Sequence, residues 1–289
     1  MNYDYYITVS SWEERSFLSA KQTCSEHSIK NALIFYTKEY EENTEENTNK
    51  LISLFDDCKI LYKKVIFSNL NQLTSWKVLD KEISTVKNST VLFDISTMPR
   101  DVIWYFLHFF NQYNCDVSII YSKPTYYGGW LSKDAGKPRL IYNHSGITNL
   151  DNPTALLIVT GFDLERASQL IQYFEPKITF LALQKGEQFD NHKKNIEIHL
   201  ENIRTYCEVD HFFFDSFTKD GGYEELRNRM STEVGQYNIV SSSLGPKPST
   251  VALYKLQKDY PQIALCYVPS SQYNVINYSN GLSSTLDIA

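Results

Sequence analysis

The sequence lacks the short motifs that mark the common nucleotide-dependent and hydrolytic enzymes. It has no G-x-x-x-x-G-K-[ST] phosphate loop, no G-x-G-x-x-G after its first strand-like run, no G-x-S-x-G nucleophile elbow and no H-E-x-x-H pair. We therefore assign no catalytic residue and no cofactor from local pattern.

Cysteine and histidine are also too few and too dispersed to build a framework. The five cysteines are odd in number and never form a C-x-x-C pair, which predicts neither a set of disulfides nor a zinc site. We expect most of them to be small buried apolar residues. His192 and His199 share one predicted helix, where we expect a solvated surface and no metal.

Basic charge and long apolar runs are scarce as well. The formal net charge of −6 argues against a surface for nucleic acid polymers, although a small anionic ligand needs only a few cations. No apolar run reaches the roughly 20 residues of a membrane span, and the start MNYDYY lacks the regions of a signal peptide. These features predict a cytoplasmic protein without a membrane partner.

What the sequence does contain is a regular alternation of strand-like and helical patterns over 289 residues. This alternation is typical of α/β proteins with mostly parallel sheets. Strands are expected at 6–10, 31–37, 64–68, 90–95, 117–121, 155–160, 177–183, 209–214, 237–242 and 263–268. Helices are expected from about 15 to 27 and at 70–86, 101–113, 163–173, 191–206, 222–235 and 250–260. The acidic stretch KEYEENTEENTNK is expected to be a solvated loop that leads into a helix ending near Cys58.

Two stretches share an arrangement that indicates an internal repeat. NIVSSSLGPKPSTVALYK (238–255) and VLFDISTMPRDVIW (91–104) each contain an apolar strand, small polar residues, a proline and a cation before a helix. Each half opens with a strand followed by Glu-Arg, and each continues past the proline to a further strand ending near Pro and Tyr. Four landmarks in one order at similar spacing predict two Rossmann-like halves, 1–125 and 153–289, joined by a connector or lid at 126–152.

The polar residues after these strands are the candidate ligand site, because open α/β sheets bind ligands beyond the carboxyl ends of their strands. Lys247 and Arg100 would pair with a phosphate, and the serine hydroxyls and loop amides would donate hydrogen bonds to it. The residues that we assign to this site are Asp94, Ser96, Arg100, Ser242, Ser243, Gly245, Lys247, Arg15, Arg166 and Tyr273.

Structural alternatives stay open for several of these residues. Asp94 is equally explained as the cap of the helix after Pro99, paired with Arg100. Arg15 and Arg166 are equally explained as partners of the neighbouring Glu14 and Glu165.

The two loops, FDISTMPR and SSSLGPKP, resemble the ligand loop of CRISPR-associated Rossmann fold domains. Two linked copies are similar to the fused arrangement of SAVED sensors in bacterial anti-phage defence. The resemblance implies a nucleotide ligand, including the cyclic kind, held across the cleft between the halves. It also implies a separate effector protein as partner.

Three hypotheses follow from the sequence. The first is a nucleotide-binding sensor or regulatory protein. The second is an enzyme that acts on a nucleotide or phosphosugar with Asp94 as general base or nucleophile. The third is an interaction protein whose aromatic helix, 101–113, binds a partner.

Overall fold

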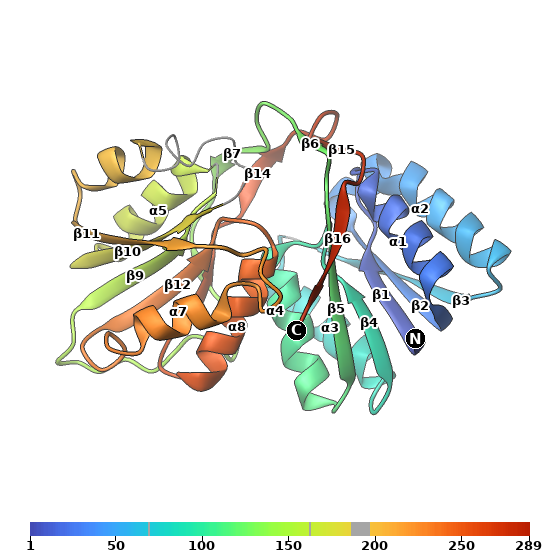
Figure 1. Ribbon diagram of the computed structural model, residues 1–289, viewed down its shortest axis with the longest axis horizontal. Coiled ribbons are helices and arrows are strands. Elements are labelled where there is room, and N and C mark those ends of the chain that lie inside the picture. Colours follow the sequence, from blue (N-terminus) through green and yellow to red (C-terminus); the bar gives the residue numbers. More distant parts are fainter. Residues whose placement is uncertain (69, 162, 186–196) are drawn as a thin grey trace. The chain divides into compact units, whose positions relative to one another are not determined.

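The computed structural model describes residues 1–68, 70–161, 163–185 and 197–289. They form two compact units (Figure 1). Unit 1 comprises Met1–Leu131 with Asn274–Ala289, and unit 2 comprises Ser132–Tyr273. In the described ranges, no helix is both long and apolar enough to cross a membrane.

Unit 1 is a parallel sheet with one antiparallel strand at its edge. Its strands are β1 (Asn2–Val9), β2 (Ser28–Thr37), β3 (Leu61–Phe67), β4 (Thr90–Asp94), β5 (Asp116–Lys123), β6 (Tyr126–Tyr127), β15 (Ser279–Asn280) and β16 (Ser284–Ile288). Its helices are α1 (Arg15–Glu26), the 3-10 helix η1 (Lys38–Tyr40), α2 (Glu41–Asp57), α3 (Gln72–Ser84) and α4 (Arg100–Gln112). The sheet order is β16-β5-β4-β1-β2-β3, and only β16 runs antiparallel to its neighbour.

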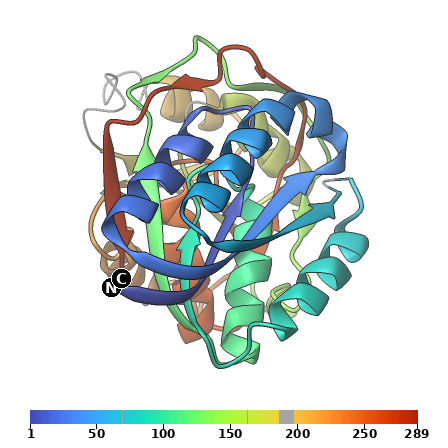
Figure 2. The same cartoon turned by 90° about the vertical axis from the view of Figure 1, so that its right-hand side faces the viewer.

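The helices of unit 1 cover both faces of this sheet. Helices α1 and α2 pack side by side, as do α3 and α4 (Figure 2). Right-handed crossovers place the two pairs on opposite faces, because the chain first adds strands on one side of β1 and then on the other. Helix α4 begins directly after Pro99, which has the extended backbone of an N-cap. Nine of its residues are buried, so this aromatic helix is a core element and leaves no free apolar face for a partner.

Unit 2 repeats this plan. Its strands are β7 (Ser132–Ala135), β8 (Arg139–Leu140), β9 (Thr154–Val159), β10 (Ile178–Gln184), β11 (Glu208–Phe214), β12 (Asn238–Ser243), β13 (Ala264–Tyr267) and β14 (Ser270–Tyr273). Its helices are α5 (Leu164–Phe174), the π-helix η2 (Glu197–Glu201), α7 (Tyr223–Met230) and α8 (Pro248–Asp259). The sheet order is β11-β10-β9-β12-β13-β8, with only β8 antiparallel to its neighbour.

The topology confirms the internal repeat that the sequence predicts. In unit 1, β1 lies in the middle with β2 and β3 on one side and β4 and β5 on the other. In unit 2, β9 lies in the middle with β10 and β11 on one side and β12 and β13 on the other. An antiparallel strand closes the edge beyond β5 in unit 1 and beyond β13 in unit 2. The fold is therefore α/β, with two Rossmann-like halves and mostly parallel sheets.

The C-terminal tail corrects the expected boundary of the second half. Residues Asn274–Ala289 belong to unit 1, where β16 pairs with β5 from Ser284↔Lys123 to Ile288↔Ile119. The end of the tail is thus an edge strand of the unit 1 sheet. Its polar composition hid a strand because an edge strand faces solvent and needs few apolar residues. The connector likewise contains short strands, of which β6 pairs with β15 and β7 with β14.

The acidic stretch after β2 also differs from expectation, because it is helical from Glu41 onward rather than a loop. Helix α2 turns its glutamates outward and buries Thr44, Asn47 and Thr48, which are polar. A helix whose buried first turns are polar shows no hydrophobic period, so the pattern that identifies helices was missing.

The predicted helix at 191–206 falls partly outside the described residues, as does His192. In the described part, Glu197–Glu201 is a π-helix. His199 is fully buried there and its Nε2 lies 2.8 Å from the carbonyl oxygen of Gly161. The expectation of a solvated surface is therefore wrong for His199.

Candidate functional site

The strand order locates one candidate edge in each unit. Ligands of open parallel sheets bind beyond the carboxyl ends of the strands, where the strand order reverses. In unit 1 this switch point lies between β1 and β4, and in unit 2 it lies between β9 and β12. The two predicted loops follow β4 and β12, so both occupy the expected places.

In unit 1, the residues that end β4 form an internal hydrogen-bond network. Asp94 is 1% exposed, and its Oδ2 accepts from the Tyr6 hydroxyl at 2.7 Å. Its Oδ1 accepts from the backbone N–H and the hydroxyl of Ser96. The Ser96 hydroxyl in turn accepts from the N–H of Ser122 at 2.8 Å. Both oxygens of the carboxylate therefore bind protein groups, and Asp94 stabilises the turn after β4.

This network also changes the acidity of Tyr6. Burial raises the pKa of the Tyr6 hydroxyl well above its usual value, and the adjacent Asp94 carboxylate raises it further. Tyr6 is therefore a neutral hydrogen-bond donor to Asp94 at neutral pH.

Arg15 is held in a buried ion pair, but its partner is Glu13 rather than Glu14. The Arg15 Nε and Nη2 atoms lie 2.9 and 2.8 Å from Glu13 Oε2, and the two side chains are 1% and 3% exposed. Arg15 Nη1 donates to the carbonyl of Ser122 at 3.0 Å, and the guanidinium lies over the Tyr121 and Tyr127 rings. Burial is the largest single influence and would lower the pKa of Arg15, but Glu13, Tyr127 and Tyr121 together outweigh it, so the pKa is raised well above its usual value.

Arg166 holds the matching position in unit 2. Its Nε lies 2.9 Å from Asp163 Oδ2, and its Nη2 donates to the hydroxyl of Ser132 at 2.7 Å. Asp163 also caps α5 by accepting from the backbone N–H of Arg166. A carboxylate thus already occupies the helix N-terminus where an anionic ligand would bind. Both arginines anchor the chain segments that leave the sheets, and each guanidinium is paired with a carboxylate of the protein.

The three serines that end β12 are buried. Ser241 donates to the carbonyl of Ala264, and the Ser243 hydroxyl lies 2.7 Å from that of Ser249 and accepts from Thr250. Ser242 is 2% exposed. These hydroxyls join β12 to its neighbour strand and to the first turn of α8. A ligand would have to displace those contacts to reach them.

Gly245 permits a close approach, but of the chain to itself. A Cβ at Gly245 would lie 2.6 Å from the carbonyl oxygen of Thr160, and a Cβ at Gly161 would lie 2.1 Å from that of Leu244. The N–H of Leu244 donates to the carbonyl of Val159 at 2.9 Å. The two loops at this switch point therefore pack backbone against backbone. Gly245 was expected to face a ligand, and the structure shows that it faces the backbone of Thr160.

Lys247 is the accessible residue of this loop. Within Ser241–Thr250, a stretch the structure describes in full, every other residue is buried. Lys247 is the N-cap of α8, whose first turn contains no acidic residue. The N–H groups of Ser249 and Thr250 already donate to the carbonyls of Pro246 and Lys247. An anion at this helix end would therefore interact with the Lys247 side chain and the helix dipole rather than with backbone amides.

Arg100 is the corresponding cation of unit 1. It is the first residue of α4 and is partly exposed. The first turn of that helix includes the buried Asp101, whose Oδ1 accepts from the N–H of Val102 at 3.0 Å. The carboxylate lowers the positive potential at this helix end, which makes α8 the more favourable of the two for an anion.

Unit 1 contributes an aromatic group that the sequence revealed only in part. The rings of Trp12 and Tyr40 meet edge to face with centroids 4.9 Å apart, and Tyr278 lies 6.1 Å from Trp12. All three are partly exposed. Trp12 and Tyr40 each follow the carboxyl end of a strand by three residues, and this position is the sequence signal that could have identified them. At the residues just before Trp12 in the chain, Asn47 Nδ2 donates to the carbonyl of Ser11, and the hydroxyls of Ser10 and Thr48 lie 2.8 Å apart.

Tyr273 is the last residue of β14 and belongs to neither of the two predicted ligand loops. Its hydroxyl is 3.5 Å from that of Tyr267, and the residue is partly exposed. Among the residues described, no group of three His, Cys, Asp or Glu side chains could hold a metal ion.

Comparisons with known proteins give no family. No protein-family model matches the chain, and no curated protein matches it. Among solved structures, the chain is similar to the cytoplasmic domain of a prokaryotic cation chloride cotransporter, with 8% identity, a TM-score of 0.30 and coverage of 95% of this chain and 99% of that one.

Two further solved structures are similar at lower scores. One is a sugar transporter from Clostridium phytofermentans, with 10% identity, a TM-score of 0.21 and coverage of 94% and 100%. The other is an ABC transporter solute-binding protein from Burkholderia graminis in complex with D-arabinose, with 11% identity, a TM-score of 0.20 and coverage of 96% and 99%. TM-scores in this range carry no functional argument, so the function is argued from the chain's own residues.

Proposed function

We propose that this protein is a sensor that binds a small phosphate-bearing ligand, a nucleotide, without converting it. The observation that carries the proposal is the position of Lys247. It is an accessible cation at the start of a helix with no acidic residue in its first turn, beside the switch point of unit 2. A cation and a helix N-terminus together favour an anion.

The aromatic group of unit 1 is a second surface of its own, and we propose that it binds the base of a nucleotide. Trp12, Tyr40 and Tyr278 present partly exposed rings at the carboxyl edge of the sheet. Stacking on such rings contributes about 1–3 kcal/mol per base in proteins that bind single-stranded nucleic acids. We treat the Lys247 loop and this aromatic group as separate binding surfaces, each with its own test.

The hydrogen bonds and burial of Asp94 favour binding of the ligand over its chemical conversion. A general base needs a lone pair that faces the substrate proton. Both Asp94 oxygens accept hydrogen bonds from Tyr6 and Ser96, and the residue is 1% exposed. A role in bacterial anti-phage defence, with a separate effector protein, belongs to this proposal through the sequence resemblance alone.

The test begins with native mass spectrometry of the purified chain, followed by thermal shifts with mono-, di- and cyclic nucleotides and inorganic phosphate. We expect a nucleotide to raise the melting temperature and to be recovered with unchanged mass. Recovery of a chemically changed product would contradict the sensor hypothesis and favour an enzyme. No shift with any of these probes would contradict the proposal.

Variants then locate the anion. Lys247→Ala should weaken binding by about tenfold, whereas Lys247→Arg should retain most of it, because the charge is preserved. The matched control is Lys177→Ala, which removes an exposed lysine just before β10, at the opposite edge of the same sheet. Equal affinity in Lys247→Ala and Lys177→Ala would remove this site. Trp12→Ala should weaken the binding of nucleotides while leaving the binding of inorganic phosphate unaffected.

A further inference from the structure

The sheets of the two units end in equivalent edge strands. Strand β3 is the outermost strand on one side of the unit 1 sheet, and β11 has the same place in the unit 2 sheet (Figure 1). In the part of the chain that the structure describes, β3 pairs with β2 alone and β11 with β10 alone. Each edge strand therefore turns one row of backbone N–H and C=O groups away from its partner, and such a row can pair with a further strand.

The hydrogen bonds of β11 show which of its backbone groups face outward. The N–H of Lys185 donates to the carbonyl of Phe214 at 2.7 Å, so Phe214 turns its backbone towards β10. Alternate residues of a strand turn their backbone groups the same way, so His211 turns its N–H away from β10. That N–H donates to the carboxylate of Asp210 at 2.7 Å. A side chain of the same strand thus accepts the hydrogen bond that a further strand would accept.

Both edges also expose apolar side chains. On β3, Leu61 is 74% exposed and Ile66 is 41% exposed. Tyr206, two residues before β11, is 61% exposed. Neither strand contains a proline, which would limit strand pairing. These edges therefore have the apolar surface and the backbone that pairing requires, and their charges decide which strand pairs with which.

The charges of the two edges are opposite in sign. Strand β3 has Lys63 and Lys64 and no acidic residue, whereas β11 has Glu208 and Asp210 and neither lysine nor arginine. Like charges that face each other across two strands are destabilising, and opposite charges attract. The lysines oppose pairing of β3 with the β3 of another molecule, and the carboxylates oppose pairing of β11 with β11. The combination that the charges favour is β3 with β11.

Part of this charge is not used within the molecule. Lys63 and Asp210 have ion-pair partners on the helices of their own units, although the Asp210 side chain is 50% exposed. Lys64 and Glu208 are exposed and form no ion pair with any residue that the structure describes. Each edge therefore keeps at least one charge for a strand of another molecule.

We propose that β3 of one molecule pairs with β11 of a second copy of this chain, so that the sheet of unit 1 continues into the unit 2 sheet of its neighbour. The contact is heterologous, because the two copies contribute different strands. Two joined molecules still have one unused β3 and one unused β11, so further copies add in the same way. This inference does not depend on ligand binding.

The size of the contact sets its strength. Each strand has seven residues. One strand pair buries less surface than the roughly 1,600 Å² of a standard stable interface, so we expect association at micromolar concentrations. Sedimentation velocity of the full-length chain between about 1 µM and about 200 µM covers this range. The average mass should rise with concentration and pass the mass of a dimer.

Two variants block one edge each. Lys64→Glu combined with Ile66→Glu replaces a cation and an apolar side chain of β3. His211→Pro removes an N–H of β11 that β10 does not use. Each variant alone should remain a monomer. An equimolar mixture should form a dimer and nothing larger, because the first variant keeps β11 and the second keeps β3.

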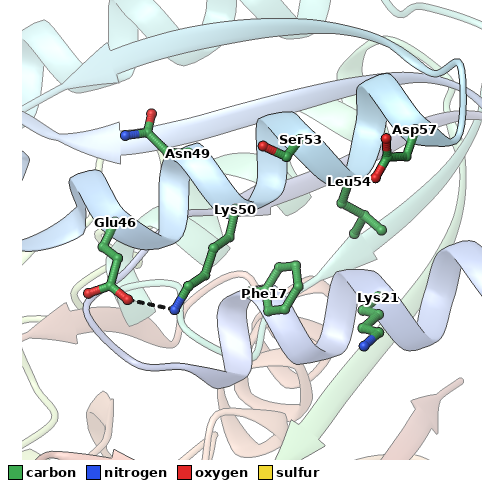
Figure 3. Close-up of a pocket in the computed structure, with 8 residues that line it drawn as sticks. All are labelled: Phe17, Lys21, Glu46, Asn49, Lys50, Ser53, Leu54 and Asp57. Carbon is green, nitrogen blue, oxygen red and sulfur yellow. Dashed lines mark hydrogen bonds and ion pairs between the residues drawn. The ribbon is translucent and has the colours of Figure 1, made fainter.

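The matched control reverses an exposed lysine of unit 1 away from the sheet edge. Lys21 lines an open groove between α1 and α2, together with Phe17 and Leu54 (Figure 3). Lys21→Glu should associate as the wild type does. Circular dichroism checks that every variant is folded. Glu208→Lys leaves the backbone of β11 unchanged and should weaken association about tenfold, and it takes the place of His211→Pro if that variant unfolds.

Three results would overturn the proposal. The first is a wild-type chain that stays monomeric at the highest concentration. The second is a mixture of the two blocked variants that forms no dimer. The third is association of either blocked variant alone at wild-type strength, because the contact would then lie on another surface or join two identical edges.

Discussion

Gly161 and Leu244 meet so closely that a Cβ added to Gly161 would lie 2.1 Å from the carbonyl oxygen of Leu244. The contact joins the loop after β9 to the loop after β12, at the switch point of unit 2. The opposing atom belongs to the backbone, so it cannot move aside as the end of a flexible side chain would. The closeness of these two loops depends on glycine at position 161.

Gly161→Ala should therefore destabilise unit 2. We expect a loss of about 1–3 kcal/mol, the usual cost of forcing an extra methyl group into a packed site. Hydrogen exchange of the β9 and β12 amides measures it, because the variant should speed exchange there. The matched control is Gly235→Ala, since a Cβ at Gly235 meets no atom within 4 Å. Equal exchange in the two variants would contradict the close contact.

The buried pair of Arg15 and Glu13 supports a second prediction. Arg15→Met should destabilise unit 1 by about 3–5 kcal/mol, because it leaves the Glu13 carboxylate buried without its counter-charge. All four tryptophans lie in unit 1, so tryptophan fluorescence during urea unfolding reports on this unit.

The control for this pair is an exposed one. Lys50 and Glu46 are joined at 2.6 Å, but their side chains are 43% and 81% exposed. Lys50→Met should cost less than about 1 kcal/mol. If Arg15→Met and Lys50→Met have similar effects, the Arg15 pair does not stabilise the unit as inferred.

The third prediction concerns acid. Asp4 lies on β1, and its pKa is lowered to about 2. The largest cause is the ion pair with Lys30, and hydrogen bonds from the backbone N–H and the hydroxyl of Thr90 add to it. The folded pKa lies below the value of about 3.9 of an unfolded aspartate. The contribution of Asp4 to stability is therefore fully present above about pH 4 and is lost as the pH falls towards 2.

Variants isolate this contribution. Asp4→Asn should flatten the fall in stability of unit 1 between about pH 4 and 2, and Lys30→Met should flatten it in part, because Lys30 is the largest cause of the shift. Urea unfolding followed by tryptophan fluorescence at several pH values measures the slope. An unchanged slope in Asp4→Asn would assign the acid sensitivity to other groups.

The elements that the sequence predicts best are those with strong local signals. The apolar run before Asp94 became β4, and Pro99 became the N-cap of α4, because a fully buried parallel strand and a helix start each leave a local pattern. The repeat was also predicted, since its landmarks recur in order. The first turns of helix α2 were missed because they bury polar side chains, and strand β16 was missed because it lies at an exposed edge.

The sequence predicted that these polar residues lie at strand ends, and it predicted only some of their hydrogen-bond and ion-pair partners. Lys247 stands at an accessible helix start, as the loop pattern indicates. Ser243, Asp94 and Arg15 instead bond to Ser249, Tyr6 and Glu13. A loop pattern shows which polar residues stand at a strand end. It does not show whether their hydroxyls and carboxylates bind a ligand or stabilise a turn, because the residue type is the same in both cases.

By itself, then, the sequence determined the α/β class, the repeated order of elements and the carboxyl edges as the places where polar groups gather, because these follow from the local alternation of apolar and polar residues. The tertiary structure alone decided which of those groups remain accessible. It also decided that the tail returns to pair with β5. Partners distant in the sequence are chosen by packing, and packing leaves no local pattern.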